Sequence, residues 1–416
     1  MKIVVCNYRY FVSGGPERYM FSLMELLGKK GHDVLPFSVA YSLNQESAYS
    51  HYFVDPPGHP DQVYFREMNL SPYRKMKAAI NAIYSINAKR KLEKMIYEQK
   101  PDIIQTLQIH TVLSYSLFDA AHKLGVPIIC RLSNYQLMCP AEHFLRDYRV
   151  CEKCHKSLLY GIRYKCVQNS LPASAIRVFS LYFNRVKNTF SHVNRFIVPS
   201  YFLKQKMIEY GYPEERVVRV PTFVPVKNFT PSYDYNDYIV YVGRIAIEKG
   251  VHHLLRAFSK IKSNTKLVVI GRRDSPEAER VFQETQDCDY HNVEFMGYQS
   301  LEKIKEIVKR AMFTVCPAIW YENNPNSIYE SFAMGKPVIG SNLGSIREQV
   351  VDGERGLLFE PGSTDDLAEK ITKLIKNPAM VRRMGKSARE YVVTEHSPEV
   401  HYQILKQIYD DVFYAH

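Results

Sequence analysis

The sequence predicts an α/β protein made of two similar units, each built on a parallel sheet. Strand-sized apolar runs alternate with helix-length segments along almost the whole chain, which is typical of parallel sheets covered by helices. The length of 416 residues is too great for one ordinary core and suits two domains. Midway, residues 221–238 interrupt the alternation with prolines and polar turn-forming residues, so a linker is expected there.

The first unit opens with a strand expected at residues 2–7 and a helix at 16–30. Gly31 ends this helix, because glycine readily adopts the backbone conformation that follows a helix C-terminus. The later strands of the unit are expected at residues 33–39, 102–105, 127–131 and 195–198.

The second unit repeats this opening with a strand from Tyr238, a turn, a helix at 250–261 and a strand at 266–271. Its later strands are expected at 293–295, 314–316 and 337–339, each separated by a helix. We therefore expect two Rossmann-like domains facing across a cleft, with the first domain, the linker and the second domain at residues 1–222, 223–237 and 238–400. Ligands of such sheets bind at the carboxyl ends of the strands, so the turns after the strands are the candidate site.

Positive charge is concentrated in the first half of the chain. The net charge is +12, and residues 1–200 hold 26 Lys and Arg against 14 Asp and Glu, whereas residues 201–416 hold 29 of each class. The densest part, residues 74–100, predicts one or two amphipathic helices with a basic outer face, because basic residues alternate there with Met76, Ile80, Ile83, Met95 and Ile96. Such a face is either a solvated helix surface or a surface that attracts an anionic membrane leaflet or an acidic acceptor.

Apolar residues make up 46% of the chain and charged residues 24%, as in soluble globular proteins, and no apolar run reaches membrane-spanning length. The N-terminal residues indicate a first strand and not a signal peptide. We expect a cytoplasmic location, at the inner face of the cell membrane if the basic half contacts lipid.

Two strand-to-helix turns have residues suited to phosphate. In the first unit Gly14 and Gly15 precede Pro16, which favours a tight turn whose helix N-terminus offers free N–H groups to an anion. The turn lacks the G-x-G-x-x-G spacing of dinucleotide sites, and a Gly-Gly turn is also common without any ligand. In the second unit Arg244 and Lys249 lie in one turn and can neutralise a diphosphate from two sides, although they could equally be two exposed cations.

A third turn, "ENNPNSIYE" at residues 322–330, places two carboxylates around a helix start. Pro325 disfavours helix before it, and Asn326 or Ser327 can cap the helix that follows. Glu322 then lies on the approaching loop and Glu330 about one turn inside the helix. Carboxylates accept paired hydrogen bonds from vicinal hydroxyls, so the three turns together suit two polyols joined by a diphosphate, as in a nucleotide sugar. The alternative is a capped helix with two solvated acids.

The stretches "YVGRIAIEKGVHHLLRAF" and "ENNPNSIYESFAMGKPVIG" resemble the retaining family-4 glycosyltransferases of GT-B fold, and the resemblance extends over essentially the whole chain. It implies that Arg244 and Lys249 bind the donor diphosphate and stabilise the leaving nucleotide. It also implies that Glu330 holds the ribose hydroxyls and Glu322 the donor sugar near the reacting carbon. The remaining donor-site positions implied are Gly14, Gly15, Gly243, Gly297 beside Tyr298, Asn323, Asn324, Asn326 and Ser327. A final helix at 401–416 is expected to pack back on the first domain.

On the acceptor side the resemblance implies a role for His110 at the sugar end of the cleft, against the alternative of a packing histidine. Many relatives have a His-Asp pair where this chain has Ser133 and Asn134, so the acceptor-side base is left open. The family implies transfer with retained anomeric configuration, in which the departing phosphate takes the acceptor proton, and no divalent metal is expected to be required. The resemblance favours a UDP-sugar over a GDP-sugar and a glycan or lipid-linked acceptor.

Four cysteines, Cys139, Cys151, Cys154 and Cys166, have the spacing C-x11-C-x2-C-x11-C. In a cytosolic chain such a cluster favours a structural zinc site, with His143 and His155 as further candidate ligands, while reduced thiols, disulfides or a redox role remain alternatives. Some family members carry a similar cysteine-bearing insertion, which would lie beside the acceptor.

Two other functions fit parts of the sequence. A nucleotide-sugar epimerase or phosphorylase can share the two-domain scaffold. A basic, zinc-containing nucleic-acid-binding protein would explain the charge and the cysteines, but it leaves Glu322 and Glu330 without a role, so no nucleic-acid partner is expected.

Overall fold

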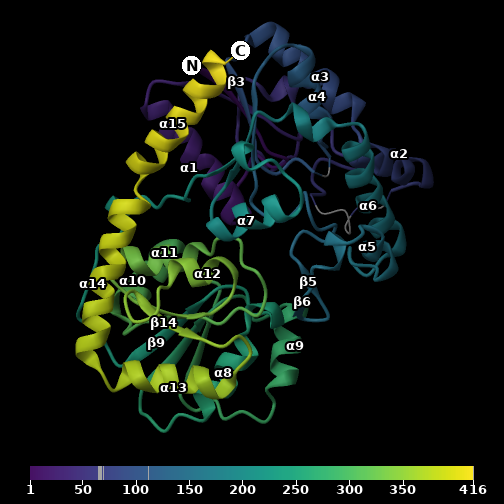
Figure 1. Cartoon of the computed structure of the whole chain (residues 1–416). Helices are drawn as coiled ribbons and strands as arrows, with labels where there is room; N and C mark the ends of the chain where they lie inside the picture. The colour runs from purple at the N-terminus through teal and green to yellow at the C-terminus, as the bar shows by residue number, and fades with distance from the viewer. Residues whose placement is uncertain (64–67, 69, 111, 416) are drawn as a thin grey trace.

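The structure, a computed structural model, describes residues 1–63, 68, 70–110 and 112–415. It contains two α/β units, one above the other in Figure 1, and each has a six-stranded, wholly parallel sheet. Two Rossmann-like units facing each other confirm the predicted fold class. In the described part of the chain, no helix has the length and apolarity needed to cross a membrane.

The first sheet has the strand order β2-β1-β3-β4-β7-β8. Its strands are β1 (Lys2–Cys6), β2 (Asp33–Phe37), β3 (Ile103–Thr106), β4 (Ile128–Arg131), β7 (Arg195–Val198) and β8 (Val217–Arg219). The helices of this unit are α1 (Gly15–Lys29), α2 (Pro72–Ile83), α3 (Ile86–Gln99), α4 (Ser116–Lys123), α5 (Leu159–Arg163), α6 (Leu171–Val186) and α7 (Tyr201–Glu209). A short antiparallel hairpin, β5 (Leu145–Arg146) with β6 (Arg149–Val150), lies within the cysteine-bearing segment.

The second sheet has the strand order β11-β10-β9-β12-β13-β14. Its strands are β9 (Tyr238–Val242), β10 (Lys266–Ile270), β11 (Val293–Gly297), β12 (Thr314–Cys316), β13 (Val338–Ser341) and β14 (Gly356–Phe359). Its helices are α8 (Val251–Ser259), α9 (Pro276–Glu284), α10 (Leu301–Arg310), α11 (Asn326–Ala333), α12 (Gly344–Gln349), α13 (Thr364–Ile375) and α14 (Pro378–Glu395). Strands β8 and β14 were not predicted from the sequence.

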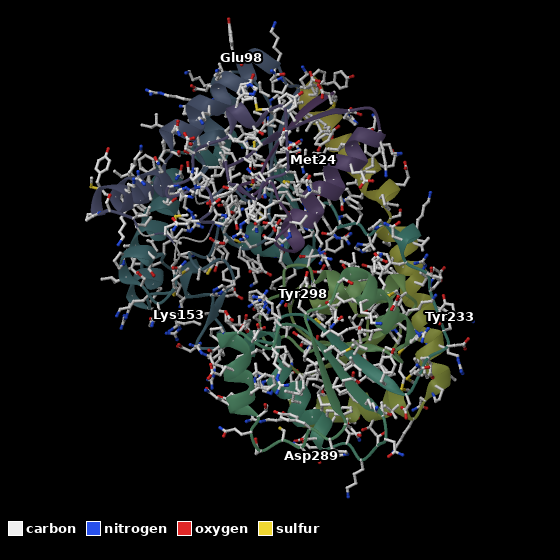
Figure 2. All side chains as sticks on the ribbon, turned by 180° about the vertical axis from the view of Figure 1, so that it is seen from behind. Met24, Glu98, Lys153, Tyr233, Asp289 and Tyr298 are labelled. Atoms are coloured by element: carbon white, nitrogen blue, oxygen red, sulfur yellow. The ribbon has the colours of Figure 1, made fainter. Side chains whose placement is uncertain are left out.

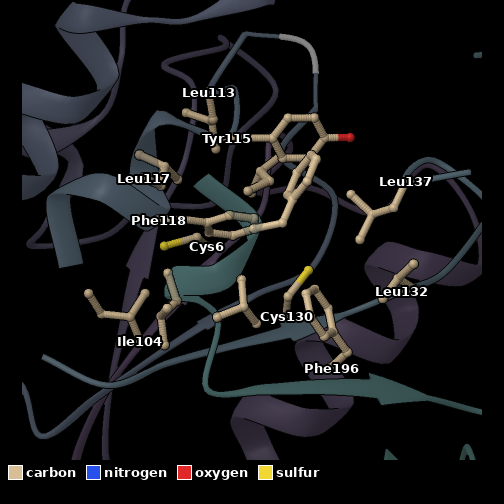
Figure 3. Packing of buried hydrophobic residues seen from close by; sticks show 14 of the residues in the cluster. Cys6, Ile104, Leu113, Tyr115, Leu117, Phe118, Cys130, Leu132, Leu137 and Phe196 are labelled. Carbon is tan, nitrogen blue, oxygen red and sulfur yellow. The ribbon is translucent and has the colours of Figure 1, made fainter. Parts of the chain in front are cut away.

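The central strands are continuous apolar runs because helices cover both faces of each sheet. Figure 3 shows one such layer, where Cys6, Ile104 and Cys130 from three neighbouring strands pack with Phe118 of α4. Serine side chains cap eight helices by accepting a hydrogen bond from a first-turn N–H; these are Ser71, Ser85, Ser170, Ser200, Ser275, Ser300, Ser363 and Ser397. The serine caps therefore mark where these eight helices begin.

The last helix, α15 (Pro398–Tyr414), returns to the first unit and packs beside α1 (Figure 1). Leu405 and Tyr409 lie in the core layer of the first sheet. Buried His401 joins α15 to the linker, since its Nδ1 lies 2.7 Å from the carbonyl oxygen of Pro221 and its Nε2 3.1 Å from the Tyr19 hydroxyl. The chain therefore connects the two units twice, once through the linker and once through α15.

A second contact between the units involves Glu348 of α12. Its carboxylate accepts hydrogen bonds from the backbone N–H groups of Tyr201, at 2.8 Å, and Phe202, at the N-terminus of α7. Burial raises the pKa of Glu348, while these two N–H groups oppose the shift. A side chain of the second unit thus satisfies a helix end of the first.

The basic segment at 74–100 forms two helices, α2 and α3, as expected. Met95 and Ile96 of α3 are buried, but no residue of α2 is buried, and its Met76 and Ile80 point outward. The expected basic residues Arg74, Lys75 and Lys77 are exposed on α2, and apolar residues are exposed beside them.

Candidate functional site

A cavity of about 240 Å³ lies between the two units, at the carboxyl ends of both sheets. Its walls come from the turn after β1, the segment after β4, the turn after β9 and the loop after β12. The lining includes seven predicted site residues, which are Gly15, Arg244, Lys249, Glu322, Asn323, Asn324 and Asn326. The position agrees with the rule for ligands of parallel α/β sheets.

Two helix N-termini meet across this cavity. A Cβ atom added to Gly15, the first residue of α1, would lie 3.4 Å from Nδ2 of Asn326, the first residue of α11. The residue that caps α11 is Pro325, with no side-chain hydrogen bond, so the expected cap by Asn326 or Ser327 is wrong. Because no side chain occupies the first N–H groups of either helix, both remain suited to an anion.

Glu322 is held by two donors. Lys249 Nζ lies 2.5 Å from its Oε1, and the indole Nε1 of Trp320 donates to the same oxygen at 2.8 Å. Gly250 makes this geometry accessible, since its φ is +70° and a Cβ there would lie 1.7 Å from the carbonyl oxygen of Pro317. Only glycine permits the turn after β9 to lie this close to the loop after β12. Trp320, which sequence reasoning missed, is the only tryptophan of the chain.

Arg244 lies on the same turn and pairs with Glu248, with 2.7 Å between NH2 and Oε1. More than half of the Arg244 side chain is exposed, so the guanidinium can move to a ligand. Gly243 precedes Arg244 and does not line the cavity. The Tyr241 hydroxyl donates a hydrogen bond to the Arg244 carbonyl at 2.6 Å and so fixes the backbone of the turn. Both predicted cations are thus at the cavity, each beside a carboxylate.

Glu330 lines a second cavity of about 120 Å³ that shares Tyr19, Thr222 and Asn326 with the first. Arg18 of α1 contacts it from the other unit, with 3.2 Å between NH1 and Oε1. Burial raises the pKa of Glu330, and Arg18 opposes that shift. The two predicted carboxylates therefore serve adjoining cavities, as the two ends of one ligand would require.

The loop between them is positioned by contacts to both units. Asn323 Nδ2 donates to the Leu132 carbonyl of the first unit at 3.4 Å, and Asn324 Oδ1 accepts from the Tyr329 hydroxyl at 3.0 Å. Asn323 Oδ1 and Asn324 Nδ2 are buried, and neither has a hydrogen-bond partner in the described part of the chain. Two unpaired amide atoms beside a cavity are expected where a polar ligand binds. Ser327 lies in the first turn of α11 and does not line the cavity.

His110 is buried and lies behind Glu142, which lines the cavity in its place. His110 Nε2 is 2.8 Å from Glu142 Oε1, and Arg177 of α6 lies 3.3 Å from the same oxygen. Asn134 is one of the two residues that this chain has in place of the His-Asp pair expected from the resemblance. Its Nδ2 donates to Oε2 of Glu142 at 2.9 Å. Burial alone would raise the pKa of Glu142, but His110 and Arg177 outweigh it and lower this pKa to about 2. Sequence reasoning missed Glu142, because it comes from the cysteine-bearing segment.

Two other predicted positions lie outside the cavity. Gly14 caps α1 with extended backbone, next to the buried carboxylate of Glu17. Gly297 ends β11, followed by the largely exposed Tyr298, which Figure 2 shows near the boundary between the units. Neither position contacts the two cavities described above.

The four clustered cysteines are free thiols, with Cys139 buried and the other three partly buried. Burial and, after it, the neighbouring thiols raise the pKa of Cys154 to about 12 and that of Cys166 to about 11. Within the described ranges, however, no group of three or more His, Cys, Asp or Glu side chains is arranged to hold a metal ion. His155 is engaged elsewhere, with Nε2 2.9 Å from the Glu209 carbonyl. The structural zinc therefore stays a prediction.

Two family models match the chain. The model described as "Glycosyltransferase Family 4" matches residues 13–228, and the one described as "Glycosyl transferases group 1" matches residues 226–391.

Curated relatives match part of the chain. An alpha-maltose-1-phosphate synthase of Mycolicibacterium smegmatis is 32% identical over 170 residues, which cover 38% of this chain and 44% of that protein. The capsular polysaccharide biosynthesis glycosyltransferase CapM of Staphylococcus aureus is 31% identical over 182 residues, 42% of this chain and 46% of that protein. The chain thus spans less than half the length of the curated relatives it matches.

Solved structures resemble the whole chain. Sucrose-phosphate synthase of Thermosynechococcus elongatus has a TM-score of 0.71 at 19% identity and covers 100% of both chains. HepE of Anabaena in complex with UDP-glucose has a TM-score of 0.66 at 14% identity, covering 98% of this chain and 99% of that one. At these identities the likeness shows the fold alone. The family models, which between them match both units, show that the chain belongs to glycosyltransferase family 4.

Proposed function

We propose that this glycosyltransferase moves a sugar from a nucleotide-sugar donor, with a UDP-sugar favoured, to a glycan or lipid-linked acceptor with retention of configuration. One observation carries the proposal. Two cations, two carboxylates and two helix N-termini surround adjoining cavities at the carboxyl ends of both sheets. Similar folds solved with UDP and with UDP-glucose support the choice of donor.

The charges of the site suit a departing diphosphate. Lys249 and Arg244 are each paired with a carboxylate, so a phosphate can replace the carboxylate as partner without either cation leaving its turn. Negative charge grows on the diphosphate as the bond to the sugar breaks, and fixed positive groups stabilise that change more than the ground state. Glu322, once released by Lys249, can accept hydrogen bonds from sugar hydroxyls.

Glu142 and His110 occupy the acceptor side. Glu142 is held as a carboxylate by its neighbours, so it can accept a hydrogen bond from the acceptor hydroxyl and orient it. The proton is taken by the departing phosphate in this scheme, and no divalent metal is required. The role first expected of His110 becomes that of a group that positions Glu142.

A capsular polysaccharide glycosyltransferase among the relatives supports a role in surface polysaccharide biosynthesis. In that role the acceptor would be a growing glycan or a lipid-linked intermediate on the cytoplasmic side of the membrane.

The test measures release of nucleoside diphosphate from a panel of UDP- and GDP-sugars, with membrane extract as the source of acceptor and with EDTA present. Lys249→Ala should reduce the rate about 100-fold, as loss of one transition-state donor does elsewhere. Lys262→Ala, an exposed lysine of the same unit, is the matched control. Turnover of a donor without acceptor would indicate an epimerase or phosphorylase instead, and no turnover by folded protein with any donor would contradict the proposal.

A further inference from the structure

Helix α2 exposes apolar side chains in a regular stripe. Tyr73, Met76 and Ile80 have the spacing i, i+3, i+7, so they lie on one side of the helix, and no residue of α2 is buried. The helix is nevertheless well formed, with Ser71 as its N-cap and Pro72 in its first turn. Its sequence thus builds an amphipathic helix whose apolar side is not used in the core.

The neighbouring helix α6 carries a second stripe. Phe179, Tyr182 and Val186 have the same i, i+3, i+7 spacing on its outer side. The two helices pack together, because Ser180 and Asn184 donate side-chain hydrogen bonds to the carbonyls of Ala82 and Ile83, each at 3.1 Å. We call the six stripe residues the α2–α6 face: Tyr73, Met76, Ile80, Phe179, Tyr182 and Val186.

Each residue of the α2–α6 face is between 53% and 70% exposed. Single exposed apolar residues are ordinary in soluble proteins, but six large ones on two packed helices are not, and such groups mark interaction surfaces. The face lies on the flank of the first unit opposite α15 (Figure 1).

The two stretches of the sequence that contain the face have basic but no acidic residues. No acidic residue occurs from Met68 to Leu92 or from Lys153 to Ile208, whereas the second stretch alone holds ten Lys and Arg. Arg74, Lys75 and Lys77 of α2 are exposed, and no acidic side chain pairs with them among the described residues. Arg74 and Lys77 fall on one side of the apolar stripe and Lys75 on the other, at 100° per residue.

We propose that the α2–α6 face docks the enzyme on an anionic lipid surface. Apolar side chains would enter the boundary between headgroups and acyl chains, while the three cations meet lipid phosphates. A partner protein is less suited, since protein interfaces are depleted in lysine and, at their core, in charged residues.

The same helix joins this surface to the cavity. The inner side of α6 carries Arg177, which contacts Glu142 at the cavity wall, and its outer side carries Phe179 and Tyr182. An α-helix with side chains is about 10 Å across. An acceptor anchored in the membrane would therefore need to extend only a short distance past α6 to present its hydroxyl to Glu142, a step that rests on the proposed function.

The test is co-sedimentation of the full chain with vesicles of phosphatidylcholine alone and with 30% phosphatidylglycerol, at low and at physiological salt. The wild type should bind the anionic vesicles and bind the neutral ones much less. Each basic residue near such a surface adds about fivefold to the partition coefficient, so R74Q/K75Q/K77Q should lower it about 100-fold. Its matched control, K262Q/K266Q/K373Q, removes the same charge from exposed positions of the second unit and should change it little.

A second variant tests the apolar part. F179S/Y182S should lower binding to anionic vesicles at least about tenfold, whereas V393S/Y414S, at exposed positions of α14 and α15, should not. Binding unaffected by both α2–α6 variants, or absent in the wild type, overturns the proposal. Concentration-dependent dimerisation of the wild type that F179S/Y182S abolishes also overturns it, because the face would then join two copies. No donor or acceptor is needed, so this result and that of the transfer assay are independent.

Discussion

Glu330→Ala gives the sharpest test of the donor site. The Glu330 carboxylate is largely buried, and Arg18 is the side chain that a bound ribose would have to displace from it. Hydrogen bonds to a charged group contribute about 1.5–3 kcal/mol each, so two ribose hydroxyls on Glu330 would contribute about 3–6 kcal/mol. Binding must first release Arg18, which is 42% exposed, and such a partly exposed pair contributes at most about 1 kcal/mol. A net loss of about 3 kcal/mol weakens the Kd for UDP about 100-fold.

The assay is titration calorimetry with UDP, supported by the fluorescence of Trp320, which lines the adjoining cavity and is the only tryptophan. Glu294→Ala, an exposed carboxylate on β11, is the matched control. Arg18→Ala removes the side chain that pairs with Glu330 in the absence of ligand. This variant should bind UDP as tightly as the wild type or up to about fivefold more tightly. An unchanged Kd in a Glu330→Ala protein of unchanged Tm would refute the ribose role.

Three further predictions concern the acceptor side, the linker and the cysteines. Glu142→Gln should leave the Kd for UDP unchanged and lower kcat/KM for the acceptor about 10- to 100-fold, since one charge-assisted hydrogen bond is lost; an equal effect on donor binding would argue against an acceptor role. Burial lowers the pKa of His401 to about 3, below the 6.5 of an unfolded histidine, so the unfolded state binds the extra proton and stability falls as pH drops below about 6.5. At pH 5 this one histidine costs about 2 kcal/mol, and urea unfolding of His401→Gln should therefore lose less stability between pH 7 and pH 5 than the wild type; equal losses would contradict the assignment. If zinc is bound, metal analysis should find one ion per chain that the double substitution Cys151→Ser/Cys154→Ser removes with a fall in Tm, and a parent protein free of zinc ends that prediction.

Much of the fold could be predicted because buried parallel strands have a simple sequence pattern. In the run at residues 266–270, the four residues after Lys266 are apolar and buried on both faces of the sheet. The predicted positions of such runs agree with the structure to within about two residues. Strands β8 and β14 were missed because each is only three or four residues long and adds to the edge of a sheet already formed. Their pairing depends on the neighbouring strand and not on local preference.

The donor side of the site was predictable for a similar reason. Arg244 and Lys249 lie in one turn and Glu322 in another, and both turns follow strands of one parallel sheet, so both are expected at the same edge of that sheet. Glu142 was not predictable, because its position depends on how residues 139–166 fold against His110 and Arg177, which are distant in sequence. The outward face of α2 was missed because periodicity identifies an apolar side of a helix but does not say what covers it.

We expect the contact between Glu348 and the start of α7 to influence how the two units move apart. The carboxylate is held by two backbone N–H groups of the other unit, whereas Arg18 and Glu330 form a single contact that is partly open to water. On the proposed function, we expect the weaker contact to separate first when the nucleotide leaves, so that the two units rotate with α7 and α12 as their hinge. We therefore expect Glu348 to influence the rate of product release from a position outside the two cavities.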